Sequence, residues 1–283
     1  MTENGKLPVL SVRGLSVAMR EGHRLVTVVD GVDFDLLPGE ILALVGESGS
    51  GKTKTAEALL GLIGPQRGQV AAQRMLLRGP PDNDLARLPE SQMRRLRGRA
   101  ISMVFQDPAT ALDPVFTIGT QVAVLFRRHR GFDRRAARAA AVDVLARVGF
   151  ADPGRTMARY PHELSGGMRQ RVSIAMAMAC QPRVLLADEP TTALDVTTQA
   201  QVLGQMTGLA RACGTAILLI THDLGIVAHY CDRALVMQGG RIVEQASVPE
   251  LFAQPSAVYT AELLARARAA AGLQYAAAQA GPQ

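Results

Sequence analysis

Short continuous apolar runs recur along this chain and predict the buried strands of a sheet. Residues 41–45 read Ile-Leu-Ala-Leu-Val and end at a glycine, which is typical of a central strand covered on both faces. Similar runs predict further strands at residues 101–105, 184–187, 216–220, 234–237 and 242–244. Gly239 and Gly240 separate the last two runs and favour a two-residue hairpin turn. Near the N-terminus, 9–17 and 25–37 read as short strands with turn residues between them.

Between the predicted strands the apolar spacing becomes helical. Asp133 is placed to cap a helix that runs through Val148, with Gly149 at its end. Further helices are predicted to start near Lys52, to run from Met168 to Cys180, and to run from Asp195 to near Gly214. Strands that alternate with helices indicate an α/β fold with a mostly parallel sheet, and residues 115–165 read as a helical insert. The Ala-rich tail after residue 265 is expected to form a short helix or no regular structure.

Composition narrows the class of protein. The chain has 283 residues, of which 48% are hydrophobic and 20% charged, as in an ordinary globular protein. The net charge of +6 is carried almost entirely by arginine, because the chain has only three lysines. Biased composition explains this charge more simply than a nucleic-acid surface, so we expect no nucleic-acid partner. The arginine-rich runs 94–99 and 127–135 could face anionic lipid or a partner, although such runs more often form a solvated face.

Cysteine usage and hydropathy indicate a cytosolic compartment. Cys180, Cys213 and Cys231 are odd in number and show no Cys-x-x-Cys spacing, which favours reduced thiols over a disulfide framework or a zinc site. The polar N-terminus lacks the apolar core of a signal peptide. Because no stretch approaches the roughly 18 apolar residues of a membrane-spanning helix, any membrane role is expected to be peripheral.

A glycine-rich segment follows the predicted strand at 41–45. Residues 46–53 read Gly-Glu-Ser-Gly-Ser-Gly-Lys-Thr and fit the phosphate-binding pattern G-x-x-x-x-G-K-[ST]. Its glycines let the backbone present N–H groups to phosphate oxygens, and the following helix directs its positive end at the same anion. Lys52 would neutralise the β- and γ-phosphates, and Thr53 would ligate Mg²⁺. A chance Gly/Ser-rich loop is the alternative, and the strand and helix on either side disfavour it.

A pair of carboxylates follows the predicted strand at 184–187. Asp188 stands at the carboxyl end of this strand, where the ligands of parallel sheets collect, and would hold Mg²⁺ through its water shell. Glu189 comes one residue later and is placed to polarise an attacking water. Paired carboxylates also occur in turns and helix starts. The phosphate loop earlier in the chain favours a functional interpretation of this pair. Together the two motifs indicate ATP or GTP as the substrate.

A third segment lies between these two motifs. Leu164, Ser165, Gly166, Gly167 and Met168 resemble the LSGGQ signature of ATP-binding cassette (ABC) ATPases, with methionine at the fifth position. Ser165 and the two glycines open a helix whose N–H groups can bind an anion, although taken alone an ordinary N-cap is the simpler interpretation. In that family the signature contacts the γ-phosphate held by the opposite subunit. The resemblance therefore implies ATP sandwiched between two chains.

Three further positions resemble the family's motifs. Gln106 matches the Q-loop, whose glutamine reaches Mg²⁺ and the water while the loop touches the membrane subunit. Residues 193–195, Ala-Leu-Asp, match the D-loop at the dimer interface. His222 matches the switch histidine that contacts the γ-phosphate, whereas a lone histidine at a strand end is more often structural. All six motifs occur in the family's order and spacing across residues 46–222.

The resemblance assigns a role to each matched residue. The catalytic residues would be Glu189, His222 and Gln106. The metal site would be formed by Thr53, Gln106 and, through water, Asp188. The nucleotide would be bound by Gly46, Glu47, Ser48, Gly49, Ser50, Gly51, Lys52, Thr53, Thr55, Asp188, Leu164, Ser165, Gly166, Gly167 and Asp195.

A narrower resemblance is carried by residues 105–108, 111–114 and 188–196. These read Phe-Gln-Asp-Pro, Ala-Leu-Asp-Pro and Asp-Glu-Pro-Thr-Thr-Ala-Leu-Asp-Val, and resemble the oligopeptide, dipeptide and nickel importer branch. The similarity covers about residues 8–265 and is greatest to the first of two non-identical ATPase subunits, in which methionine at the fifth signature position is common.

Three departures from the branch pattern stand out. Many relatives stack an aromatic ring on adenine, whereas the matching stretch here offers His23 and aliphatic residues such as Val26. Residues 255–260 resemble the His-Pro-Tyr-Thr motif but lack its His-Pro. Many peptide-importing relatives end in a cysteine cluster that carries an iron–sulfur centre, and this chain has no cysteine after Cys231. We therefore predict no such cluster. In its shortness the chain resembles nickel-type subunits.

The resemblance implies a P-loop ABC ATPase fold with a mostly parallel core sheet, an N-terminal antiparallel β-subdomain and a helical subdomain. The ATPase domain is predicted over 8–255, with the helical subdomain inserted at about 115–165, and residues 256–283 form a short C-terminal extension. The implied function is ATP- and Mg²⁺-dependent uptake of peptides or nickel-type substrates at the cytoplasmic face of a bacterial inner membrane. The implied partners are a second, non-identical ATPase subunit, two transmembrane permease subunits and, indirectly, a substrate-binding protein.

Three other functions compete with this interpretation. Soluble ABC ATPases of DNA repair, chromosome maintenance or translation usually carry coiled coils, zinc modules or two cassettes, and this sequence has none. A cassette that binds ATP without turnover is disfavoured by intact Lys52, Asp188, Glu189 and His222. An exporter remains open, although exporters commonly fuse membrane helices to the cassette.

Overall fold

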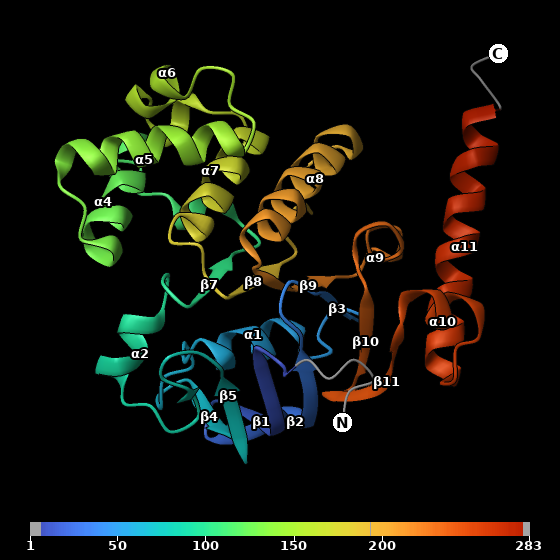
Figure 1. The fold of residues 1–283 in the computed structure, drawn as a ribbon. Helices are drawn as coiled ribbons and strands as arrows, with labels where there is room; N and C mark the ends of the chain where they lie inside the picture. Colours follow the sequence, from blue (N-terminus) through green and yellow to red (C-terminus); the bar gives the residue numbers. More distant parts are fainter. Residues whose placement is uncertain (1–6, 193, 280–283) are drawn as a thin grey trace.

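Two β-sheets and a group of helices make up the described chain (Figure 1). The computed structural model describes residues 7–192 and 194–279, and the side chains of these residues except at 109 and 270–279. Within them, the larger sheet has the strand order β11-β10-β3-β9-β8-β7. Its strands are β3 (Ile41–Val45), β7 (Ile101–Val104), β8 (Val184–Asp188), β9 (Ala216–Thr221), β10 (Arg233–Gln238) and β11 (Arg241–Ser247).

The register of the larger sheet brings the carboxyl ends of three strands to one edge. β3 and β9 are parallel up to the pair Val45 and Thr221, and β8 runs parallel to β9 up to Asp188. Every residue of β3 is buried, which explains why its sequence is a continuous apolar run. The segments that follow these three strands therefore leave the sheet side by side. The predicted α/β class with a mostly parallel sheet is confirmed.

The smaller sheet is antiparallel and comes from the N-terminal part of the chain. It contains β1 (Leu10–Glu21), β2 (Arg24–Leu36), β4 (Gly68–Ala71), β5 (Arg74–Leu77) and β6 (Asn83–Asp84). β1 pairs with β2, β4 and β5. The predicted strand at 9–17 is too short, because backbone pairing with β2 continues to Glu21 and Arg24 through a stretch with no apolar pattern. The predicted antiparallel subdomain is confirmed.

Helices α4, α5 and α6 lie together, away from the two sheets (Figure 1). In the described residues the helices are α1 (Lys52–Leu59), α2 (Glu90–Leu96), α3 (Pro108–Ala111), α4 (Ile118–Arg130), α5 (Arg134–Arg147), α6 (Pro153–Ala158), the 3₁₀ turn η1 (Pro161–Glu163), α7 (Gly166–Met178), α8 (Val196–Cys213), α9 (Leu224–Tyr230), α10 (Val248–Ala253) and α11 (Val258–Gln279). Leu145 of α5 and Ile174 of α7 belong to one apolar cluster with Leu185 of β8. This cluster joins the separate helices to the larger sheet.

The predicted helix caps are found at their expected positions. The carboxylate of Asp133 accepts a backbone hydrogen bond of 2.7 Å in the first turn of α5, and that of Asp195 accepts one of 3.0 Å in α8. The helix predicted to run from Met168 to Cys180 is α7, and its predicted start is wrong by two residues. α7 begins at Gly166, because the hydroxyl of Ser165 caps it by accepting the Met168 amide at 3.3 Å.

The Ala-rich tail forms the long helix α11. Leu264 of this helix is 3% exposed and packs in an apolar cluster with Val45 of β3 and Val236 of β10. The polar residues 1–6 and the Gly-Pro end within 280–283 lie outside the described residues. Among the helices that are described, none has both the length and the apolar character needed to cross a membrane.

The central strand β9 allows a direct test of the core. Leu218 is fully buried between β3 and β8, so we expect Leu218→Ala to lower the free energy of unfolding by about 2–5 kcal/mol. Leu25→Ala is the control, because Leu25 is 42% exposed. Urea denaturation of both variants measures the difference, and equal shifts of the midpoint would contradict the assigned core.

Candidate active site

Residues 46–53 form a tight loop between β3 and α1. Gly46 and Gly51 have φ angles of 155° and 106°, which side-chain-bearing residues rarely adopt. A Cβ atom on Gly46 would collide with the carbonyl oxygen of Met237, and one on Gly51 with that of Val28. The loop therefore packs backbone to backbone against β10 and β2. Only glycine fits at these two positions.

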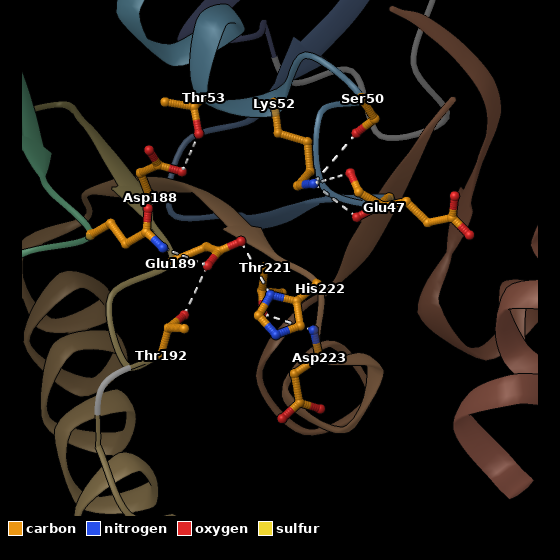
Figure 2. A network of polar contacts seen from close by, with 12 residues as sticks. Glu47, Ser50, Lys52, Thr53, Asp188, Glu189, Thr192, Thr221, His222 and Asp223 are labelled. Atoms are coloured by element: carbon orange, nitrogen blue, oxygen red, sulfur yellow. Dashed lines mark hydrogen bonds and ion pairs between the residues drawn. The ribbon is translucent and has the colours of Figure 1, made fainter. Parts of the chain in front are cut away.

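The ammonium group of Lys52 lies inside this loop. It donates to the carbonyl oxygens of Gly46 and Glu47, both at 2.8 Å, and to the hydroxyl of Ser50 at 3.4 Å (Figure 2). Lys52 is 6% exposed. Burial lowers the pKa of Lys52, and the carboxylates of Glu189 and Asp188 partly offset this effect. A positive charge is thus concentrated where the sequence predicts phosphates to bind.

Thr53 and Asp188 bring two oxygen ligands together. The hydroxyl of Thr53 donates to Asp188 Oδ1 at 3.1 Å. Asp188 is 3% exposed, and burial raises the pKa of its carboxyl group, although the hydrogen bond from Thr53 acts in the opposite direction. A buried carboxylate beside a hydroxyl is a suitable donor set for a hard divalent cation such as Mg²⁺. The residues therefore fit the predicted metal.

The carboxylate of Glu189 is held by three side chains (Figure 2). Its Oε2 accepts from Gln106 Nε2 at 3.1 Å and from the hydroxyl of Thr192 at 3.0 Å, and its Oε1 lies 3.1 Å from His222 Nδ1. Glu189 has a φ of 44°, and its amide donates to the carbonyl of Ile220 at 3.0 Å. A non-glycine residue in this conformation is strained, and such strain is common at functional sites. The carboxylate has a fixed orientation suited to activating a water.

The three predicted catalytic residues line one cavity with the phosphate loop. This cavity has a volume of about 590 Å³, and its walls include Gln106, Glu189 and His222. From the loop, Lys52 and Thr53 also line it. The structure therefore brings together Lys52 and His222, which are 170 positions apart in the sequence.

Three residues of this site, Val28, Lys54 and Thr192, were missed by the sequence analysis. Thr192 lies three residues after Glu189 and bonds to its carboxylate, a spacing that the sequence alone does not mark as functional. Val28 of β2 lines the cavity, whereas Val26 is 39% exposed and the candidate His23 is also exposed. The aliphatic wall at Val28 is two residues away from the candidate adenine contact at Val26.

Other predicted ligands lie elsewhere. Within the described chain, the cavity walls include no residue from 164–167, and Gly166 instead lines a separate cavity of about 170 Å³ with Gln106. Ser165 and Asp195 act as helix caps, and the hydrogen bond from Thr198 lowers the pKa of Asp195. The D-loop prediction at Ala193 lies outside the described residues.

Two residues of the phosphate loop region also point away from the cavity. The hydroxyl of Thr55 donates to the Gly51 carbonyl at 3.1 Å and is fully buried in α1. The carboxylate of Glu47 accepts from Arg266 at 2.6 Å. One chain thus places the phosphate loop beside the catalytic residues but leaves the signature segment outside their cavity.

Comparisons with known proteins agree with this geometry. A family model described as ABC transporter matches residues 29–192. The dipeptide transport ATP-binding protein DppD of Bacillus subtilis is 46% identical over 256 residues, covering 90% of this chain and 76% of the relative. The oligopeptide transport ATP-binding protein AppD of the same organism is also 46% identical over 256 residues, covering 90% and 77%.

Solved structures show the same fold. A dimeric structure of MJ0796, described as a bacterial ABC transporter cassette, has a TM-score of 0.72 at 24% identity and covers 84% of this chain and 98% of that one. The structure of cbiO1 from Clostridium perfringens, described as part of the ABC transporter complex cbiONQ, has a TM-score of 0.69 at 26% identity and covers 87% and 91%. The lower of the two identities supports the fold alone.

The chain belongs to the ABC transporter family. It is an ABC-type ATPase, and ATP is its nucleotide. The resemblance drawn from the six motifs is confirmed, and the relatives are named for the peptide side of the predicted importer branch.

The packing of the phosphate loop generates a test. We expect Gly46→Ala to weaken ATP binding about tenfold or more, because the new methyl group meets the Met237 carbonyl and the backbone angle becomes strained. Gly204→Ala is the matched control, since Gly204 lies within α8 with open space around it. It should leave ATP binding unchanged and stabilise the fold by about 0.5–1 kcal/mol. Titration with a fluorescent ATP analogue measures the affinity of each variant for ATP. Equal affinities for the two variants would contradict the loop geometry.

Proposed function

We propose that this chain is the ATP-hydrolysing subunit of a peptide importer and works as one of a pair of ATPase subunits. The observation that carries this proposal is the position of the Glu189 carboxylate, held by Gln106, Thr192 and His222 beside the phosphate loop. The names of the dipeptide and oligopeptide transport relatives favour peptides as the substrate over nickel-type cargo.

We assign the chemical roles as follows. The loop amides and Lys52 bind the β- and γ-phosphates, and Thr53, Gln106 and, through water, Asp188 hold Mg²⁺. When bound, Mg²⁺ neutralises charge on the phosphate oxygens. Glu189 polarises the attacking water as general base, and its bonds to Gln106 and Thr192 fix its direction. His222 Nδ1 lies 3.1 Å from Oε1 of Glu189, the oxygen that Gln106 and Thr192 do not contact. We propose that His222 contacts the γ-phosphate.

The remaining nucleotide contacts are proposed to come from a second chain. Residues 164–167 and Asp195 lie outside the cavity of their own chain, and the exposed Ser165 and Asp195 are accessible to an ATP molecule bound by the partner. N–H groups in the first turn of α7 are proposed to bind the γ-phosphate of that molecule. MJ0796, which shares this fold, forms a dimer. We propose a non-identical ATPase subunit as the partner here.

The names of the peptide transport relatives favour an assembly with membrane subunits. We propose two transmembrane permease subunits as partners, a substrate-binding protein that acts through them, and a peripheral position on the cytoplasmic face of a bacterial inner membrane. The ATPase domain is proposed to span 8–255, with the helical subdomain at about 115–165, and the C-terminal extension 256–283. The grouping of α4, α5 and α6 supports this insertion (Figure 1).

The role of Glu189 can be tested by removing its charge alone. Glu189→Gln should lower the rate of ATP hydrolysis about 10²- to 10⁴-fold while ATP binding persists, so that a closed, ATP-bound dimer accumulates. Glu21→Gln, at an exposed position on β1, is the charge-matched control. Phosphate release and size-exclusion chromatography with ATP provide the readouts. A rate in Glu189→Gln close to that of the control would remove Glu189 from this role.

The shared site can be tested in mixed dimers in which only one of the two sites can hydrolyse ATP. This chain carries Glu189→Gln, so hydrolysis depends on the ATP bound at the phosphate loop of the partner chain. Ser165→Arg should abolish this hydrolysis when placed in the Glu189→Gln chain, because the signature of that chain faces the site that still hydrolyses ATP. The equivalent substitution in the partner's signature should leave the rate within about twofold, because that signature faces the site in which Glu189→Gln has already stopped hydrolysis. Equal loss in both arrangements would contradict the shared site.

A further inference from the structure

The phosphate loop is contacted from outside the active site by the C-terminal helix α11. The amide of Glu47, the second residue of the loop, donates to the hydroxyl of Tyr259 at 3.1 Å. The carboxylate of the same residue accepts from Arg266 Nη1 at 2.6 Å. Figure 2 shows the Glu47 carboxylate pointing away from Asp188, Glu189 and His222. Both contacts therefore reach the loop from the side opposite the catalytic residues.

Tyr259 and Arg266 share one face of α11. They are seven residues apart, which is nearly two helical turns, so their side chains point in the same direction. Arg266 also lies 3.8 Å from Glu262, one turn earlier on the same face. One rigid surface of the helix thus contacts both the backbone and the side chain of Glu47.

Helix α11 is itself fixed to the larger sheet. The carboxylate of Glu244 on β11 accepts the amides of Ser256 and Ala257, at 2.7 and 3.0 Å, just before the helix begins. Burial raises the pKa of Glu244, but the hydrogen bonds, that from Ser256 foremost, outweigh it and lower the pKa overall. Leu264 packs in one cluster with Val45, the last residue of β3. The helix is therefore anchored to the strand from which the phosphate loop departs.

The backbone of Glu47 connects this helix to the groups that face phosphate. Its carbonyl oxygen accepts from Lys52 at 2.8 Å and from the amide of Ser50 at 3.2 Å. Holding the amide and the carboxylate of Glu47 therefore also holds the carbonyl that orients the Lys52 ammonium. Phosphate binding by successive amides depends on such a fixed loop, because an ordered loop loses less conformational entropy on binding.

We propose that Tyr259 and Arg266 are positioning residues that hold the phosphate loop through Glu47 and thereby set the affinity for ATP without touching it. This inference rests on the proposed role of residues 46–53 in binding the phosphates. It gives a function to Tyr259 of the Tyr-Thr pair at 259–260, which the sequence analysis left without one. The same contact offers a route by which any partner that displaces α11 would weaken ATP binding.

A purely structural role predicts different behaviour. The Arg266–Glu47 pair is exposed, with 65% and 55% of the side chains accessible, so its contribution to global stability is small. Attachment of α11 to the fold depends on Leu264 and Glu244 instead. Removing the contacts to Glu47 should therefore change loop order and ATP affinity, and leave the unfolding transition in place.

The test uses Tyr259→Phe and Arg266→Gln, singly and together, in the full chain assembled with its partner subunit. Each single variant should raise the KM for ATP about three- to tenfold, the size expected for one lost hydrogen bond or charge pair, with kcat within twofold. Arg266→Lys should keep KM within about twofold of the natural chain. In a Glu47→Gln background, Arg266→Gln should have a much smaller effect, because the charge pair is already broken.

Arg268→Gln is the matched control. Arg268 lies on the same helix, but its guanidinium donates to the carbonyl of Phe252 at 2.9 Å and does not reach the loop. Its KM should equal that of the natural chain. A KM unchanged in both Tyr259→Phe and Arg266→Gln would overturn the proposal. So would a loss of kcat together with a lower unfolding midpoint, which indicates a structural role only.

Lys52→Ala separates this inference from the proposed function. If Lys52→Ala abolishes binding of ATP while the two α11 variants leave KM unchanged, the positioning role alone fails. If Lys52→Ala binds ATP as tightly as the natural chain, the phosphate loop assignment fails, and the positioning role fails with it. A raised KM in the α11 variants together with lost binding in Lys52→Ala supports both.

Discussion

The parallel register of β3, β8 and β9 is the constraint on which the active site depends. The pairing of these strands brings their carboxyl ends to one edge, where the phosphate loop, Glu189 and His222 follow the strands directly. Continuous apolar runs keep these strands inside the sheet, because all three strands are buried. The polar groups of the site are thus held by a rigid apolar scaffold, while each catalytic side chain comes from a short segment just beyond it.

The site also combines strain with opposed charges. Glu189 has a left-handed backbone conformation that its hydrogen bonds to Ile220 and to three side chains maintain. Burial lowers the pKa of Lys52 and raises the pKa of Asp188, so each charged group gains from a neighbouring charge of opposite sign. We propose that these groups form half of a catalytic unit. Because the start of α7 lies outside their cavity, we propose that the other half is supplied by a second chain.

Sequence reasoning was most successful where a local pattern determines structure. The strand β3 was predicted from its apolar run, and the caps Asp133 and Asp195 from side-chain chemistry alone. It failed where tertiary contacts decide. Val28 reaches the cavity from β2, a strand of the other sheet. Thr192 is close to Glu189 in the sequence, but its spacing matches no pattern that marks the hydrogen bond between them. The contact between α11 and Glu47 joins residues more than 200 positions apart, and no local pattern carries that information.

The dependence of ATPase activity on protein concentration tests the shared site most directly. Hydrolysis between two chains requires association, so in an equal mixture of this chain and its partner the turnover rate per chain should rise with concentration and reach a plateau where analytical ultracentrifugation shows only dimers. The same rate per chain at every concentration, including those at which only monomers sediment, would contradict a site shared between two chains.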